Sequence, residues 1–181
     1  MLLDIDVHGF EKDIIPYIKN GIILDTSVIK IFIDGFIATR FSKKPIKDIP
    51  EYNQLLVFFD LIKINGQFDK FLITPHILTE VCNHFRNDYG KTYKKEIFEE
   101  VMPFLCGMSE ANVGKNRIFD RLNIIKPIEI GDLSICVLTD DFIGEKNKIT
   151  ILAKDAGLNA NYKDHPTVMV MDFQSIYYSL L

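Results

Sequence analysis

Apolar residues along the chain follow two spacings, which predict two kinds of element. Short runs of consecutive apolar residues predict buried strands at 21–25, 71–74, 148–153 and 167–171. Apolar residues at helical spacing predict helices from residue 28 onward and at 51–64, 75–87, 93–105, 131–138 and 174–181. Strands that alternate with helices are typical of an α/β fold with a mostly parallel sheet of four to five strands.

Two segments interrupt this pattern. Residues 43–50 are predicted to form a loop, because their prolines and charges break the periodicity. Residues 107–121 are polar and ambiguous, and one interpretation is a flexible loop near the functional site. Pro103 is expected to bend or end the helix over 93–105.

Four carboxylates fall where the predicted elements end or begin. Asp25 and Asp155 directly follow apolar strands, and the ligand crevice of an open parallel sheet lies beyond the carboxyl ends of its strands. Glu80 lies beside the apolar stripe of the helix over 75–87, and Asp132 lies at the start of the helix over 131–138. Taken singly, an Asp here is often a helix cap and a Glu is usually exposed to solvent. The joint pattern favours one shared site.

Carboxylates that converge in one crevice repel one another, and a divalent cation removes that repulsion. Oxygen ligands without Cys or His suit Mg²⁺ or Mn²⁺. Such ions activate water and hold a phosphate, so the cluster is typical of a phosphodiester hydrolase. Asp140 or Asp141 is an alternative ligand to Asp132, although the pair is expected at the other end of the helix.

The four acids stand in segments that resemble the motifs of PIN domains, the fold of VapC-like toxin ribonucleases. The four segments are Ile22-Ile23-Leu24-Asp25-Thr26-Ser27, Ile73-Thr74-Pro75-His76-Ile77-Leu78-Thr79-Glu80-Val81, Gly131-Asp132-Leu133-Ser134-Ile135 and Ile151-Leu152-Ala153-Lys154-Asp155. The resemblance implies a three-layer α/β/α sandwich. It also implies a Mg²⁺ or Mn²⁺ site made by Asp25, Glu80, Asp132 and Asp155, with RNA, single-stranded or structured, as the substrate. An antitoxin or other protein partner and a homodimer are further expectations from the same resemblance.

The fourth motif departs from the family pattern. The family commonly has Thr two residues before the acid, where this chain has Ala153, and Lys154 is also unexpected there. An ammonium group beside the cluster would contact phosphate or weaken the binding of a metal ion. A non-catalytic PIN-like module that binds RNA or a protein partner is therefore the alternative function. A phosphotransfer domain that uses Asp25 is a third hypothesis, and Ser27 stands where its phosphatase form needs a second Asp.

Composition fits one globular domain. The chain has 181 residues, of which 48% are hydrophobic and 25% charged. The resemblance implies an N-terminal extension over 1–20 and a PIN-like nuclease domain over 21–181. No apolar run approaches the roughly 18 residues of a membrane span, and no signal peptide is evident. The three cysteines (Cys82, Cys106 and Cys136) are scattered through apolar helical patterns, which predicts buried thiols in the cytoplasm.

Charge and aromatic residues add three weaker expectations. The formal net charge of −4 argues against a protein that coats nucleic acid, although not against an enzyme that contacts a short stretch. Three basic clusters (around Lys43, Lys94 and Arg117) and the helical row of His76, Glu80 and His84 are expected to be mostly solvated. Leu55, Leu56, Phe58 and Phe59 are expected in the core, with a partner surface as the alternative.

Overall fold

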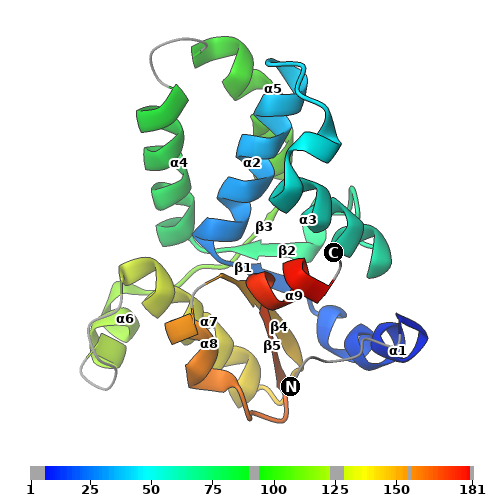
Figure 1. Ribbon diagram of the computed structural model, residues 1–181. Coiled ribbons are helices and arrows are strands. Elements are labelled where there is room, and N and C mark those ends of the chain that lie inside the picture. Colours follow the sequence, from blue (N-terminus) through cyan, green and yellow to red (C-terminus); the bar gives the residue numbers. More distant parts are fainter. Residues whose placement is uncertain (1–6, 90–93, 123–128, 155, 180–181) are drawn as a thin grey trace.

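The computed structural model describes residues 7–89, 94–122, 129–154 and 156–179, and at its centre lies a parallel sheet (Figure 1). The strands stand in the order β3-β2-β1-β4-β5, and all four neighbouring pairs are parallel. Their bounds are β1 Ile22–Leu24, β2 Phe71–Ile73, β3 Ser109–Glu110, β4 Ile149–Ala153 and β5 Val168–Asp172. The predicted parallel α/β sheet and its four apolar strands are confirmed.

Helices lie on both faces of this sheet. Their bounds are α1 Val7–Ile18, α2 Thr26–Arg40, α3 Pro50–Leu61, α4 Pro75–Tyr89, α5 Lys94–Gly107, α6 Lys115–Leu122, α7 Ile130–Gly144, α8 Ala156–Tyr162 and α9 Phe173–Ser179, with short 3₁₀ turns at Ile46–Asp48 and Phe68–Lys70. In Figure 1, α2 to α5 lie on one side of the sheet and α6 to α8 on the other. The result is the predicted three-layer α/β/α sandwich.

The chain changes direction across the sheet at β1. From β1 it proceeds to β2 and β3 on one side, then returns through α6 and α7 to β4 and β5 on the other side of β1. If the crossovers are right-handed, this reversal places the helices before β3 on one face of the sheet and the helices after β3 on the other face. A crevice therefore opens at the carboxyl ends of β1 and β4, which is the topological switch point of the fold.

The strands are buried because both faces are covered. All three residues of β1 and all five of β4 are buried, which explains why these strands read as continuous apolar runs rather than alternating ones. Leu55, Phe58 and Phe59 of α3 are also buried, so the prediction that they belong to the core is confirmed, and Leu56 packs against that core. An aromatic group of Phe32, Phe68 and Phe104 joins α2 to α5, with ring centroids 4.0 Å apart for Phe32 and Phe104.

The end of the N-terminal extension packs on the sheet. Ile14 and Ile18 of α1 lie in the core. The hydroxyl of Tyr17 donates to the carbonyl of Pro166 (3.0 Å), and the amide of Asn20 donates to the carbonyl of Lys148 (2.8 Å). These bonds attach α1 to the amino ends of β4 and β5, at the edge opposite the crevice.

The polar segment over 107–121, for which a flexible loop was one interpretation, contains regular structure. It contributes β3, which pairs with β2 through Leu72 opposite Ser109, and the helix α6. A two-residue strand carries too little periodicity to be recognised in a sequence, and α6 is short, with Ile118 as its buried residue. Pro103 does not end α5, which continues to Gly107. The helix α8 was not expected, and α7 continues well past residue 138, to Gly144.

The expectation of three buried thiols is wrong for two of them. Cys82 on α4 and Cys106 on α5 are exposed, and Cys136 on α7 is buried. Cys82 directly follows the buried Val81, so one position along a helix was enough to turn it out of the core. Burial raises the pKa of Cys136 to about 11. Among the described residues, no helix is both long and apolar enough to cross a membrane.

Close packing of α2 on α3 depends on Gly35. A Cβ atom at Gly35 would lie 2.1 Å from Cγ of Tyr52, which is buried and cannot move aside freely. We expect Gly35→Ala to lower the free energy of unfolding by about 1–3 kcal/mol, because overpacking outweighs the better helix propensity of Ala. Urea unfolding measures this. The matched control is Gly144→Ala, where an added Cβ meets nothing within 4 Å and stability should be unchanged or slightly higher. Equal stability of both variants would contradict the packing argument.

The cysteines differ in accessibility and acidity. Alkylation requires the thiolate, and Cys136 is buried with its pKa raised to about 11. At pH 8 we expect iodoacetamide to modify Cys82 and Cys106 in the folded chain, while Cys136 reacts only after unfolding. Peptide mass spectrometry of protein treated with and without urea checks this. Rapid native labelling of Cys136 would show that α7 is packed more loosely than described.

Candidate functional site

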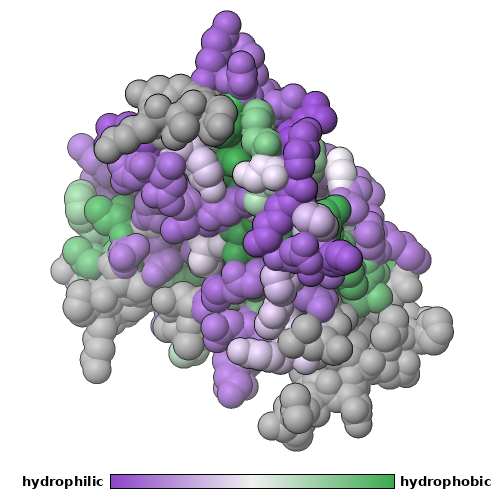
Figure 2. Space-filling view, turned by 45° about the horizontal axis from the view of Figure 1, so that its top comes forward, coloured by the Kyte–Doolittle hydropathy of each residue, from purple (hydrophilic) through white to green (hydrophobic). Residues whose placement is uncertain are grey.

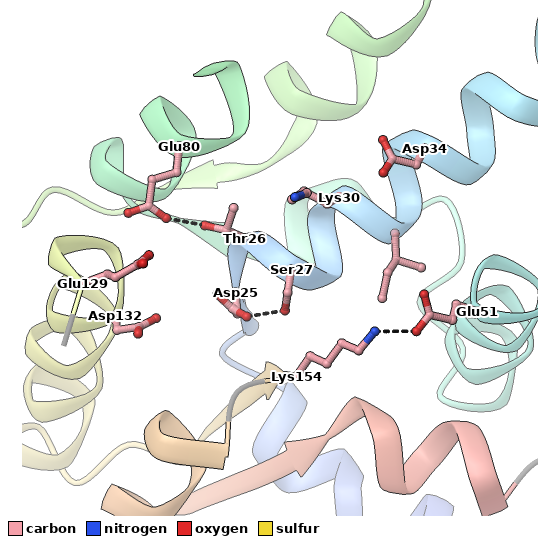
Figure 3. Close-up of a pocket in the computed structure, with 11 residues that line it drawn as sticks. Asp25, Thr26, Ser27, Lys30, Asp34, Glu51, Glu80, Glu129, Asp132 and Lys154 are labelled. Carbon is pink, nitrogen blue, oxygen red and sulfur yellow. Dashed lines mark hydrogen bonds and ion pairs between the residues drawn. The ribbon is translucent and has the colours of Figure 1, made fainter. Parts of the chain in front are cut away.

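A pocket of about 730 Å³ lies at the switch point of the sheet (Figure 3). It is reached from the carboxyl ends of β1 and β4 and is flanked by α2, α3, α4 and α7. Its lining residues are Asp25, Thr26, Ser27, Lys30, Ile31, Asp34, Glu51, Glu80, Glu129, Asp132 and Lys154. Three of the four acids expected from the sequence (Asp25, Glu80 and Asp132) therefore line one pocket.

Asp25 lies at the bottom of this pocket and is 6% exposed, the only acidic side chain among the described residues that counts as buried. It occupies the N-cap position of α2, but its carboxylate accepts no capping hydrogen bond from that helix. Oδ2 accepts a hydrogen bond from the hydroxyl of Ser27 instead. A buried carboxylate needs partners to offset its desolvation. The position of Asp25 is thus not explained by helix capping.

Glu80 on α4 links the first turns of two other helices. Its Oε2 accepts a hydrogen bond from the hydroxyl of Thr26 at the start of α2 (2.7 Å). Its Oε1 accepts one from the backbone N–H of Gly131 in the first turn of α7 (3.1 Å). The first N–H groups of a helix have no partner within the helix, and a helix N-terminus favours a negative charge. Glu80 therefore fixes α4 against both α2 and α7.

Gly131 permits this approach because it has no side chain. A Cβ atom there would lie 2.4 Å from Oε1 of Glu80 and 2.7 Å from its carboxyl carbon. Glycine is needed wherever another group approaches the backbone this closely. The two residues of the Gly131-Asp132 pair thus have separate roles. Gly131 contacts Glu80, and Asp132 places a further carboxylate in the pocket.

Two carboxylates of α7 face the pocket. Glu129 is the N-cap residue of this helix and makes no capping bond with its side chain, and Asp132 lies three residues later in the first turn. In Figure 3, Glu129 and Asp132 point toward the same space as Asp25 and Glu80. Glu129 was not expected from the sequence. It stands before the recognisable helix pattern, so only its position three residues before Asp132 could have indicated it.

Two lysines also line the pocket. Lys154 follows β4, and its ammonium forms an ion pair with Glu51 of α3. Lys30 lies on α2, one turn after Thr26. Asp34 of α2 also lines the pocket, and it accepts hydrogen bonds from Tyr89 (2.7 Å) and from Nε2 of His84 (3.1 Å), both on α4. The pKa of Tyr89 is raised well above its usual range, first by burial and then by Asp34, so this hydroxyl remains a donor.

The remaining sequence expectations lie outside the pocket or outside the described residues. Asp155 is not among the described residues, so its role stays a prediction. The alternative ligands are occupied elsewhere: Asp141 is ion-paired with Arg117, and Asp140 with Arg121 at 3.3 Å. His84 was expected to be mostly solvated, but its side chain is 11% exposed and lies between Asp34 and Asp88, 3.1 Å from each.

The pocket's chemistry fits a hard divalent cation. Within the described part of the chain, no three His, Cys, Asp or Glu side chains are arranged to hold a metal ion directly. Mg²⁺, however, usually keeps several of its waters and takes only one or two protein carboxylates besides phosphate oxygens. Asp25, Glu80, Glu129 and Asp132 supply such oxygens from the side of the pocket away from Lys154. The donor set therefore suits Mg²⁺ or Mn²⁺ rather than a softer ion.

Comparison with known proteins gave no relative: no protein-family model, no curated protein and no solved structure matches this chain.

The contact between Glu80 and Gly131 can be tested by a double-mutant cycle. Gly131→Ala should displace the Glu80 carboxylate and remove its hydrogen bond, whereas in a Glu80→Ala background the added methyl group meets no carboxylate. We expect a coupling free energy of about 1 kcal/mol or more between the two sites, the scale of a hydrogen bond to a charged group. Urea unfolding of the four proteins measures it. Additive effects would show that Glu80 does not depend on the glycine.

Proposed function

We propose that this chain is a metal-dependent nuclease that hydrolyses phosphodiester bonds of RNA, with Mg²⁺ or Mn²⁺ held by its carboxylates. The observation that carries the proposal is the meeting of Asp25, Glu80 and Asp132 in one pocket at the switch point of the sheet. These residues come from three distant parts of the chain, and for Asp25 the ordinary structural explanation, helix capping, does not apply.

The residues take different parts in the proposed reaction. Asp25, Glu80 and Asp132 would hold the cation, and Glu129 faces the same space as an additional oxygen donor. A bound ion of this kind supplies charge neutralisation for the phosphate and a more acidic water. Ser27 and Thr26 orient the Asp25 and Glu80 carboxylates through the hydrogen bonds described above. In the hydrolysis a water oxygen bonds to phosphorus, the ester P–O bond breaks, and the leaving oxygen takes up a proton.

RNA as the substrate, rather than DNA, is taken from the resemblance of the four sequence motifs to PIN domains. The pocket suits a polar ligand, since Ile31 is the one apolar residue among the described residues that line it. Hydrophilic residues also cover most of the described face shown in Figure 2, with small hydrophobic areas between them. An antitoxin-like protein partner and a homodimer belong to the same proposal.

A non-catalytic module is the second candidate. The observation that favours it is Lys154, whose ammonium lines the same pocket as the carboxylates and neutralises part of their charge. Calorimetry with Mg²⁺ and Mn²⁺ separates the two candidates. Site-specific binding that is lost in Glu80→Gln supports the nuclease, and no binding by a folded protein supports the module.

The catalytic proposal is tested with Asp25→Asn. We expect the wild type to cleave mixed-sequence single-stranded RNA with Mg²⁺ or Mn²⁺ and to stop when a chelator is added. The variant should lose activity about 100-fold or more, because the amide keeps the shape of the side chain and removes its charge. Product formation on a denaturing gel measures both rates, with DNA of the same sequence run in parallel.

The matched control is Asp164→Asn, an exposed acid before β5 at the opposite edge of the sheet. It should cleave at the wild-type rate. Full activity of Asp25→Asn, or cleavage that persists in chelator, would contradict the proposed site. Cleavage of DNA alone would keep the site and change the substrate.

A further inference from the structure

The ion pair between Lys154 and Glu51 spans the pocket on the side away from the α7 carboxylates. In Figure 3 it lies across Asp25 and Ser27 from Glu129 and Asp132. The side chains of Lys154 and Glu51 remain 31% and 46% exposed. An exposed ion pair of this kind contributes little to stability, so the lysine can change partner at small cost.

Lys30 on α2 is a second cation of the pocket, and in Figure 3 it lies between Thr26 and Asp34. Among the described residues it has no ion-pair partner. The nearest acid on its own helix that lines the pocket is Asp34, one turn further on, whose carboxylate is bonded to His84 and Tyr89. Lys30 forms no ion pair with that acid, so its ammonium group is available to a ligand in the pocket.

We propose that Lys154 forms a phosphate-binding subsite for the backbone of single-stranded RNA, next to the phosphate that is cleaved, with Lys30 as a second phosphate contact, and that Glu51 holds Lys154 until an RNA phosphate displaces it. This inference rests on the proposed nuclease function. An ammonium group is a compact charge with three donors, which suits a phosphate oxygen at a fixed place. Glu51 occupies the position of that phosphate when no RNA is bound, so it competes with the substrate.

Because of this competition, substitutions of Lys154 and of Glu51 should change the affinity for RNA in opposite directions. Removing the lysine removes a phosphate contact, whereas removing the charge of Glu51 frees the lysine for RNA. A merely structural ion pair would not do this, because loss of either partner would then disturb the pocket in the same direction.

The test measures RNA binding without cleavage. Fluorescence anisotropy follows a labelled ten-nucleotide single-stranded RNA with chelator present, on the full chain carrying Asp25→Asn as the parent. We expect Lys154→Met and Lys30→Met each to weaken binding about tenfold, Glu51→Gln to tighten it about threefold, and Lys154→Met with Glu51→Gln to match Lys154→Met alone. The slope of log K against log salt should fall by about 0.7 for each lysine removed.

Lys19→Met is the matched control, because Lys19 is exposed at the end of α1, before β1 and at the opposite edge of the sheet. Its affinity and salt slope should equal those of the parent, and urea unfolding should show that all variants fold. Changes below twofold for Lys154→Met, a loss of affinity in Glu51→Gln, or no RNA binding by the parent would overturn the subsite. Cleavage by wild type with unchanged binding in the lysine variants would keep the nuclease and remove the subsite. The expected binding shifts without any cleavage would keep the subsite and remove the nuclease.

Discussion

The carboxylate of Glu80 holds together the three helices that surround the pocket. It stands on α4 and bonds at once to the first residue of α2 and to the second residue of α7. Both contacts use groups at helix N-termini, where unpaired N–H groups and the helix dipole favour a carboxylate. The same bonds set the orientation of α7, and with it the direction in which Glu129 and Asp132 enter the pocket. The geometry of the site therefore depends on one glycine, Gly131, that lets Glu80 come this close.

The topology explains why the pocket lies where it does. The sheet order β3-β2-β1-β4-β5 places the reversal of the chain between β1 and β4, so the helices that follow these strands diverge. Asp25 leaves β1 at that point, and its amide donates to the carbonyl of Leu152 in β4 (3.1 Å). This bond keeps the two strand ends together and holds a charged side chain at the carboxyl end of the fully buried strand β1. The carboxylate can remain there because the pocket above it is polar.

The sequence predicted the parts of the fold and site that depend on local pattern. Continuous apolar runs marked β1 and β4, and the acids placed after or beside such runs, Asp25 and Glu80, line the pocket. Contacts between distant segments were not predictable in the same way. The pairing of β3 with β2 depends on tertiary structure rather than on its own two residues. Glu51 is a further example, because nothing near it in the sequence indicates Lys154, which lies 103 residues away.

The balance of charge in the pocket bears on how a chain of net charge −4 could bind a polyanion. Six carboxylates and two lysines line it, and two of those carboxylates have partners outside the α7 side: Asp34 is bonded to Tyr89 and His84, and Glu51 to Lys154. The other four face one another without an equal number of cations among the lining residues. Phosphate would be repelled from that side until a divalent ion reverses its field. Lys154 would attract phosphate without such help once Glu51 releases it. Under the proposed function, a phosphate chain would enter along Lys154, and its reacting group would lie against the carboxylates on the side of α7.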